Sequence, residues 1–138
     1  MLDRHEAAGT TSSPEYQEGT MVFYRRHLNR MEPWPEELNR AFELVNADLY
    51  ATMWGPSEFS ATGTLKDYDA SGRLGRIRVP TLFVCGEHDE ATPAACRDFA
   101  GMVPNAKAEI IPGASHTAHL EQRELFMRTV REFLAGLE

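Results

Sequence analysis

The chain has 138 residues, of which 42% are hydrophobic and 25% charged, a balance typical of one globular domain. Its 21 acidic residues against 14 basic ones give a formal net charge of -7, which argues against a nucleic-acid partner, since such proteins cluster Lys and Arg. There is no run of eighteen apolar residues and no charged-then-apolar leader, so we expect neither a membrane partner nor a signal peptide. Two cysteines are too few for a disulfide framework and favour a reducing, cytoplasmic setting.

The first half of the chain has a helical pattern. Residues 1–75 are rich in aromatic, Met and charged residues at helical spacing and predict a helical cap region with its connection to a core. A Ser-Pro-Glu start and apolar residues at intervals of three and four predict a helix over 14–30. Two prolines break it, and further helices are expected over 36–45 and 49–54. Residues 57–75 should form an irregular connection.

The second half, residues 76–138, changes to a strand, helix, strand, helix pattern. A nearly continuous apolar run over 79–85 is typical of a parallel strand buried on both faces, and a second strand is expected over 107–111. Helices are expected over 93–102 and 121–137, the last with a buried apolar side made of Leu125, Phe126, Val130, Phe133, Leu134 and Leu137. The two strands should be parallel neighbours, which makes the fold class α/β. Two such strands form an incomplete core, because parallel sheets need both faces covered and usually more strands.

The turn after each predicted strand carries a residue that could take part in proton transfer. Asp89 comes after the first strand and His116 after the second, in the order acid then base. Because the carboxyl ends of neighbouring parallel strands meet at one edge of a sheet, we expect the two side chains to lie close together. An acid bonded to one imidazole nitrogen leaves the other to accept a nucleophile's proton, so the pair is a candidate catalytic acid and base. On spacing alone, two ordinary surface residues remain the alternative.

A metal site is a second use that these histidines could have. His116 and His119 lie near Glu121, and His88 precedes two acids. Neither spacing matches the helical pair of His at i and i+4, with a Glu between them, that binds zinc in metalloproteases. There is also no glycine-rich phosphate loop. We therefore expect no metal and no other cofactor, and we interpret His88, His119 and His5 as surface groups.

Four segments of the chain resemble the proline iminopeptidases, which are α/β-hydrolase aminopeptidases: Trp54-Gly-Pro-Ser-Glu-Phe59, Thr62-Gly-Thr-Leu-Lys-Asp67, Val79-Pro-Thr-Leu and Gly86-Glu-His-Asp-Glu-Ala-Thr-Pro93. The resemblance implies the C-terminal portion of an α/β-hydrolase, parallel strands with flanking helices, preceded by a helical cap.

The same resemblance implies roles for particular residues. It makes Asp89 the triad acid and His116 the general base, and it implies that Glu58 and Glu90 bind the free α-amino group of a short peptide substrate. The implied activity is release of N-terminal proline or small apolar residues. Two carboxylates can bind a charged amine through charge-assisted hydrogen bonds, which suits the binding of an α-amino group. An aromatic set, Tyr50, Trp54 and Phe59, could line the substrate pocket, although ordinary packing explains it equally well.

The nucleophile that this family uses is absent. The sequence has no Gly-x-Ser-x-Gly elbow. The segment Gly113-Ala-Ser-His-Thr117 lacks the second Gly and lies on the turn that carries His116, which we call the base turn. We therefore expect the chain to correspond to the second half of such an enzyme, to need a nucleophile-bearing N-terminal half as partner, and to be inactive alone. Two alternatives are another α/β-hydrolase, such as an esterase or epoxide hydrolase, and an inactive fragment that acts only as a binding module.

Overall fold

The computed structural model describes residues 1–58 and 60–137. Phe59, which the sequence placed among possible pocket residues, lies outside the described residues. No helix in the described part of the chain is both long and apolar enough to cross a membrane. The described residues group into two compact units: 1–24 with 33–58 and 60–69, and 25–32 with 70–137.

The first unit is helical, as its sequence pattern predicts. Its helices are α1 (Leu2–Ala8), α2 (Pro14–His27, whose last turn groups with the second unit), α3 (Glu36–Glu43) and α4 (Ala47–Met53). The sequence did not predict α1. It also extended α2 to about Arg30, whereas the helix ends at His27. It ends early because the next backbone groups bond elsewhere: the carbonyls of His27 and Leu28 accept the N–H groups of His116 and Thr117.

His5 connects α1 to the start of α2. The sequence suggested a surface group, and this is wrong, because His5 is only 9% exposed. Its Nδ1 lies 2.8 Å from the Thr10 hydroxyl and 3.1 Å from the Ser13 hydroxyl, and its Nε2 lies 3.1 Å from a Glu15 carboxylate oxygen. These polar contacts compensate the burial of the imidazole.

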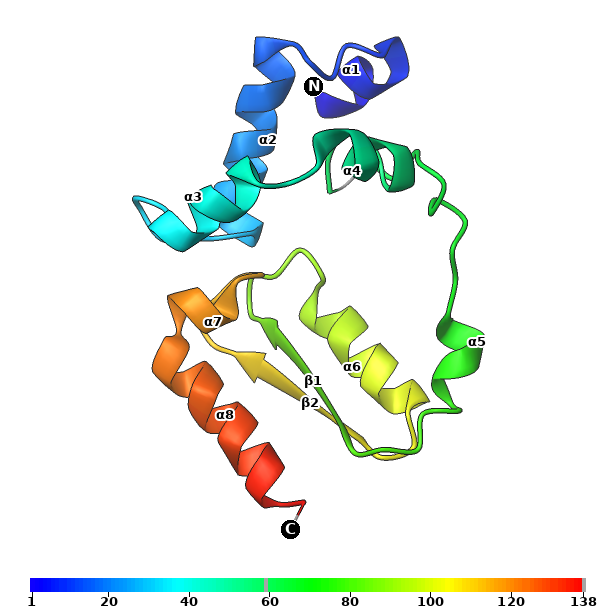
Figure 1. Ribbon diagram of the computed structural model, residues 1–138, viewed down its shortest axis with the longest axis vertical. Coiled ribbons are helices and arrows are strands. Elements are labelled where there is room, and N and C mark those ends of the chain that lie inside the picture. The colour runs from blue at the N-terminus through cyan, green and yellow to red at the C-terminus, as the bar shows by residue number, and fades with distance from the viewer. Residues whose placement is uncertain (59, 138) are drawn as a thin grey trace. The chain divides into compact units, whose positions relative to one another are not determined.

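The second unit is an α/β arrangement, as predicted. Its elements are α5 (Ser71–Leu74), β1 (Thr81–Gly86), α6 (Pro93–Met102), β2 (Ala106–Ile111), α7 (Ala118–Glu121) and α8 (Arg123–Ala135). The two strands pair in parallel, from Thr81 opposite Ala106 to Gly86 opposite Ile111. Figure 1 shows α6 and α8 flanking the strand pair on opposite sides. The helix predicted over 121–137 corresponds to α8, and the short α7 before it was not predicted.

The core of this unit lies under the carboxyl ends of the strands. Ile111, Ala114 and Ala118 are buried together, and partly buried hydrophobic side chains pack against them: Val84, Leu125 and Phe126. The expected burial of Leu134 and Leu137 is wrong, since they are 54% and 48% exposed. Two strands offer α8 only a narrow surface to cover, so the end of its apolar face meets solvent.

Candidate functional site

The turn after β1 presents Asp89. Its carboxylate accepts two backbone N–H groups, from Ala91 to Oδ1 at 2.8 Å and from Gly86 to Oδ2 at 3.3 Å. The turn is also held from outside, because the N–H of His88 donates to the carbonyl of Ala114 at 2.9 Å. Directly after this turn Thr92 caps α6 by accepting the N–H of Ala95, and Pro93 opens the helix. The acid therefore sits on a short, closed turn between a strand and a helix.

The turn after β2 presents His116. Gly113 has a φ of 70°, a left-handed conformation that favours glycine, and its N–H donates to a Glu87 carboxylate oxygen at 2.9 Å. The N–H of Glu87 in turn donates to the carbonyl of Ile111 at 3.0 Å. The two turns are thus bonded to each other as well as to their own strands.

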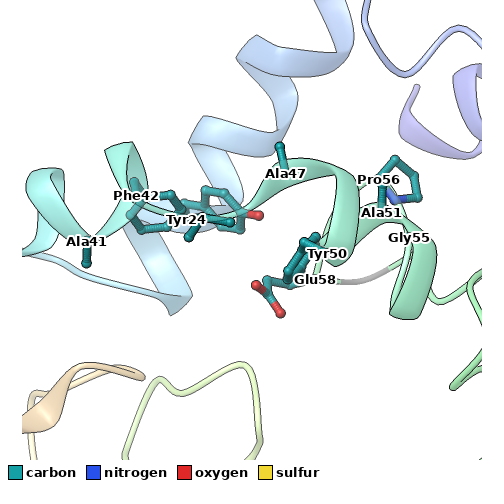
Figure 2. Close-up of a pocket in the computed structure, with 10 residues that line it drawn as sticks. Tyr24, Ala41, Phe42, Ala47, Tyr50, Ala51, Gly55, Pro56 and Glu58 are labelled. Atoms are coloured by element: carbon teal, nitrogen blue, oxygen red, sulfur yellow. The ribbon is translucent and has the colours of Figure 1, made fainter.

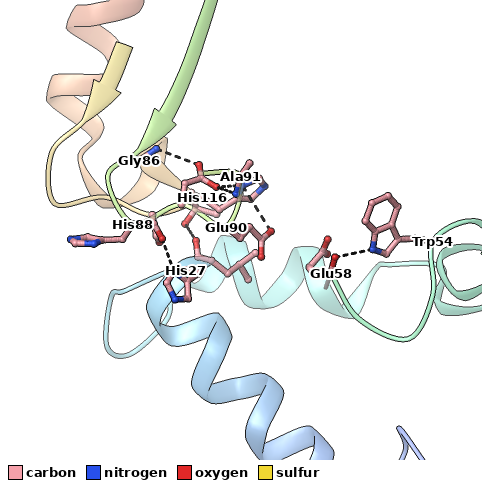
Figure 3. A network of polar contacts seen from close by, with 12 residues as sticks. His27, Trp54, Glu58, Gly86, His88, Glu90, Ala91 and His116 are labelled. Carbon is pink, nitrogen blue, oxygen red and sulfur yellow. Dashed lines mark hydrogen bonds and ion pairs between the residues drawn. The ribbon is translucent and has the colours of Figure 1, made fainter. Parts of the chain in front are cut away.

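This arrangement brings Asp89 and His116 together, as neighbouring strand ends predict. Figure 3 shows His116 close to Glu90 and Ala91 of the turn after β1. His116 Nδ1 lies 2.9 Å from Asp89 Oδ1. An ionised carboxylate only accepts hydrogen bonds, so Nδ1 carries the proton and Nε2 is the basic nitrogen of the ring. The Asp89 side chain is 3% exposed, whereas that of His116 is 48% exposed. A buried acid that orients a partly exposed imidazole is the geometry of an acid and base pair in hydrolysis.

The environment of Asp89 keeps it ionised. Burial raises the pKa of this carboxyl, but hydrogen bonds from His116 and from the N–H groups of Ala91 and Gly86 outweigh burial. The pKa therefore lies below the usual value for Asp. An ionised Asp89 is the form that holds the Nδ1 proton of His116 in place.

Glu90 follows Asp89 and lies at the same place. Its side chain is 14% exposed, and its Oε1 is 4.0 Å from His116 Nδ1. The second unit thus gathers two carboxylates and one imidazole at the carboxyl ends of its strands. This negative, partly buried position suits a cationic group of a ligand.

Glu58 belongs to the first unit, in the loop after α4. The loop is tied back to the helix, since the N–H groups of Thr62 and Gly63 donate to the carbonyl of Trp54 at 2.8 and 2.6 Å. The indole N–H of Trp54 donates to the backbone carbonyl of Glu58 at 3.0 Å. The backbone carbonyl of Glu58 is therefore held by the side chain of Trp54.

The Glu58 side chain lines a mostly apolar pocket of about 470 Å³ (Figure 2). A second hollow of about 510 Å³ shares Val45, Tyr50 and Glu58 with the first and is also lined by Trp54. The aromatic residues Tyr24, Phe42 and Tyr50 line the first pocket, and among the described residues that line it Glu58 alone is charged. Such a site suits a ligand that combines an apolar group with a positive charge.

Sequence reasoning missed the residues that hold the base turn. His27 donates from its ring Nδ1 to the carbonyl of His88 at 2.9 Å, and its own carbonyl accepts the N–H of His116 at 3.0 Å. Glu121, weighed in the sequence only as a metal ligand, accepts hydrogen bonds from Ser115 and from the N–H of Arg30. Apart from Ser115 and Glu121, which are six positions apart, these partners are 61 or more positions apart, so no periodic pattern signals them.

The sequence also raised Ser115 as a nucleophile and several histidines as metal ligands. The Ser115 side chain is fully buried and its hydroxyl donates to Glu121 at 2.9 Å. Within residues 1–58 and 60–137, no group of three or more His, Cys, Asp or Glu side chains is placed to hold a metal ion.

Comparison with known proteins identifies the family of the chain. Residues 5–129 match the alpha/beta hydrolase family. The proline iminopeptidase of Heyndrickxia coagulans is 36% identical over 137 residues, which are 99% of this chain and 48% of that protein. The chain spans about half the length of the curated relatives that it matches.

Two crystal structures are similar to this chain in both sequence and fold. VinJ is 40% identical with a TM-score of 0.92, over 99% of this chain and 47% of its own. The proline iminopeptidase of Mycobacterium smegmatis is 42% identical with a TM-score of 0.85, over 98% of this chain and 46% of its own. The chain therefore belongs to the alpha/beta hydrolase family and, within it, resembles the proline iminopeptidases over nearly its whole length.

Proposed function

We propose that this chain supplies the acid, the base and the amine-binding carboxylates of a serine aminopeptidase that releases N-terminal proline or small apolar residues from short peptides. The observation that carries the proposal is the 2.9 Å contact between buried Asp89 and His116 at neighbouring strand ends. The similarity to curated proline iminopeptidases supports the substrate class.

The acid and base would act in two steps. His116 Nε2 accepts the hydroxyl proton of the serine as its oxygen attacks the scissile carbonyl. The imidazolium that forms is stabilised by Asp89 and then delivers the proton to the leaving amine. A water molecule repeats the sequence on the acyl-enzyme, and the serine leaves with the proton. Asp89 stays ionised throughout, because its pKa lies below the usual value.

The serine would come from a nucleophile-bearing N-terminal half, which we propose as the chain's partner. β1 and β2 pair only with each other among the described residues, and apolar side chains of the second unit remain exposed, such as Leu134 and Val79. Further strands would cover such surface and complete a parallel sheet. The two buried free thiols, Cys85 and Cys96, support a reducing, cytoplasmic setting.

The test compares the purified chain with the enzyme completed by that half. We expect a prolyl chromogenic substrate to be hydrolysed by the completed enzyme, with inhibition by a serine-directed reagent, and not by the chain alone. Turnover by the chain alone, blocked by the same reagent, would contradict the need for a second half.

The amine anchor can be tested separately in the completed enzyme. Glu58→Gln and Glu90→Gln each remove a negative charge but keep the size of the side chain. Losing one charge-assisted hydrogen bond costs about 1.5–3 kcal/mol, so kcat/KM for a prolyl peptide should fall about ten- to hundredfold. Hydrolysis of a simple ester without an amine should be unchanged.

Glu37→Gln, an exposed acid of α3, is the matched control and should leave both activities intact. If both site variants kept wild-type peptide turnover, the carboxylates would not bind the amine, and a hydrolase without amine recognition would be the better assignment.

A further inference from the structure

A polar cluster, buried except for the partly exposed Glu121, holds the residues on both sides of His116. We call it the base-turn cluster, and it consists of Asn29, Ser115, Thr117 and Glu121. Asn29 and Ser115 have no exposed surface, and Thr117 is 8% exposed. Buried polar groups without partners are costly, so the arrangement of these hydrogen bonds determines where the backbone can lie.

Glu121, the last residue of α7, makes the largest set of these bonds. Its Oε2 accepts the N–H of Ser115 and its Oε1 accepts the N–H of Arg30, both at 2.6 Å. The Ser115 hydroxyl lies 2.9 Å from both carboxylate oxygens. One carboxylate thus joins the residue before His116 to the segment that follows α2. Short hydrogen bonds to an ionised acceptor are among the stronger ones in proteins.

Asn29 and Thr117 hold the other side of His116. The Asn29 amide donates to the Thr117 hydroxyl at 2.7 Å, and that hydroxyl donates to the carbonyl of Leu28 at 2.9 Å. The N–H groups of His116 and Thr117 donate to the carbonyls of His27 and Leu28, both at 3.0 Å. The backbone of His116 and Thr117 is therefore bonded directly to residues 27–28, and Ser115 is joined to Arg30 through the Glu121 carboxylate.

We infer that Glu121 is a positioning residue for His116: it fixes the backbone from which the imidazole reaches Asp89 and does not itself touch the reacting atoms. The His116 ring is half exposed, whereas its neighbours Ser115 and Thr117 are buried. Its place relative to Asp89 therefore depends on the main chain on each side. The catalytic meaning of this role rests on the proposed function, whereas the structural part does not.

The inference predicts a specific effect of Glu121→Gln. The variant keeps the size of the side chain but replaces one acceptor oxygen with an NH2 donor. One of the three donors from Ser115 and Arg30 then loses its acceptor and faces another donor. The turn must shift to relieve this, and proton transfer is sensitive to shifts of about 1 Å.

The first measurement is NMR of the ¹⁵N-labelled 138-residue chain. We expect the Nδ1 proton of His116, held by Asp89, to exchange with water about tenfold faster in Glu121→Gln, the effect expected for losing one charge-assisted hydrogen bond. Glu124→Gln is the matched control, because Glu124 is an exposed acid in the first turn of α8. It should leave the exchange rate unchanged.

A folded Glu121→Gln chain with the wild-type exchange rate would overturn the inference. If circular dichroism shows that this variant does not fold, Ser115→Ala decides instead, since it removes only the hydroxyl bonds to Glu121. Faster exchange of the His116 proton in Ser115→Ala supports the inference, and an unchanged rate overturns it.

The second measurement is kinetics of the completed enzyme. Glu121→Gln should lower kcat about ten- to hundredfold with KM unchanged, because it alters the proton-transfer geometry and not substrate binding. A wild-type kcat would overturn the positioning role. A completed enzyme that hydrolyses no prolyl substrate, together with faster proton exchange in the variant, would refute the proposed function and leave the positioning of His116 supported.

Discussion

Asp89→Asn should lower kcat of the completed enzyme about ten-thousandfold while leaving the fold intact. Asp89 Oδ1 accepts both the N–H of Ala91 and the Nδ1 proton of His116, and Oδ2 accepts the weaker bond from Gly86. An asparagine must turn its NH2 toward one of these groups. If the NH2 faces His116, the ring carries its proton on Nε2 and cannot act as the base, and if it faces Gly86, the imidazolium still loses the negative charge that stabilises it. Steady-state kinetics on a prolyl chromogenic substrate measures the loss.

The matched control for this variant is Asp98→Asn, which removes the same charge from an exposed position on α6 and should leave kcat unchanged. A kcat within tenfold of wild type in Asp89→Asn would mean that this pair is not the catalytic acid and base.

The same variant should change how stability depends on pH. Because the pKa of Asp89 is lowered in the folded chain, its stabilising contribution is present above the usual Asp pKa of about 4. That contribution is lost as the pH falls through the lower native pKa. In urea unfolding at a series of pH values, the free energy of unfolding of Asp89→Asn should therefore fall less at acid pH than that of the wild type.

Gly86→Ala should lower the free energy of unfolding by about 3 kcal/mol, at the upper end of what overpacking usually costs. Gly86 is the buried last residue of β1, and a Cβ there would overlap the carbonyl oxygens of Ala114 and Ser115 in the base turn. Those atoms are backbone and cannot move aside like a side chain, because the N–H of His88 is bonded to the Ala114 carbonyl at 2.9 Å. Urea unfolding of the 138-residue chain measures the loss.

Gly101→Ala is the control for this second prediction. Gly101 lies in α6 with nothing near the added Cβ, so the substitution should raise the free energy of unfolding by about 0.5–1 kcal/mol through helix propensity. If the unfolding midpoint of Gly86→Ala equals that of the wild type, then Gly86 does not pack directly against the carbonyls of Ala114 and Ser115.

The elements that could be predicted from the sequence are those with a local signal. The apolar run before Gly86 predicted β1 and its parallel pairing with β2, and this pairing in turn predicted that Asp89 and His116 meet. Hydrophobic periodicity arises from which face of an element is buried, so it is visible in the residues of that element alone. The first helix, α1, has no strong apolar period and was missed.

The sequence by itself determined the class of fold, the order acid then base, and the presence of Glu58 and Glu90 in motifs like those of proline iminopeptidases. Only the tertiary structure decided that α2 ends at His27, that residues 25–32 group with the second unit, and that Glu121 and Asn29 hold the base turn. The physical reason is that such contacts are single hydrogen bonds between turns far apart in the chain. Their partners become neighbours only after the strands and helices have packed, so no local pattern in the sequence records them.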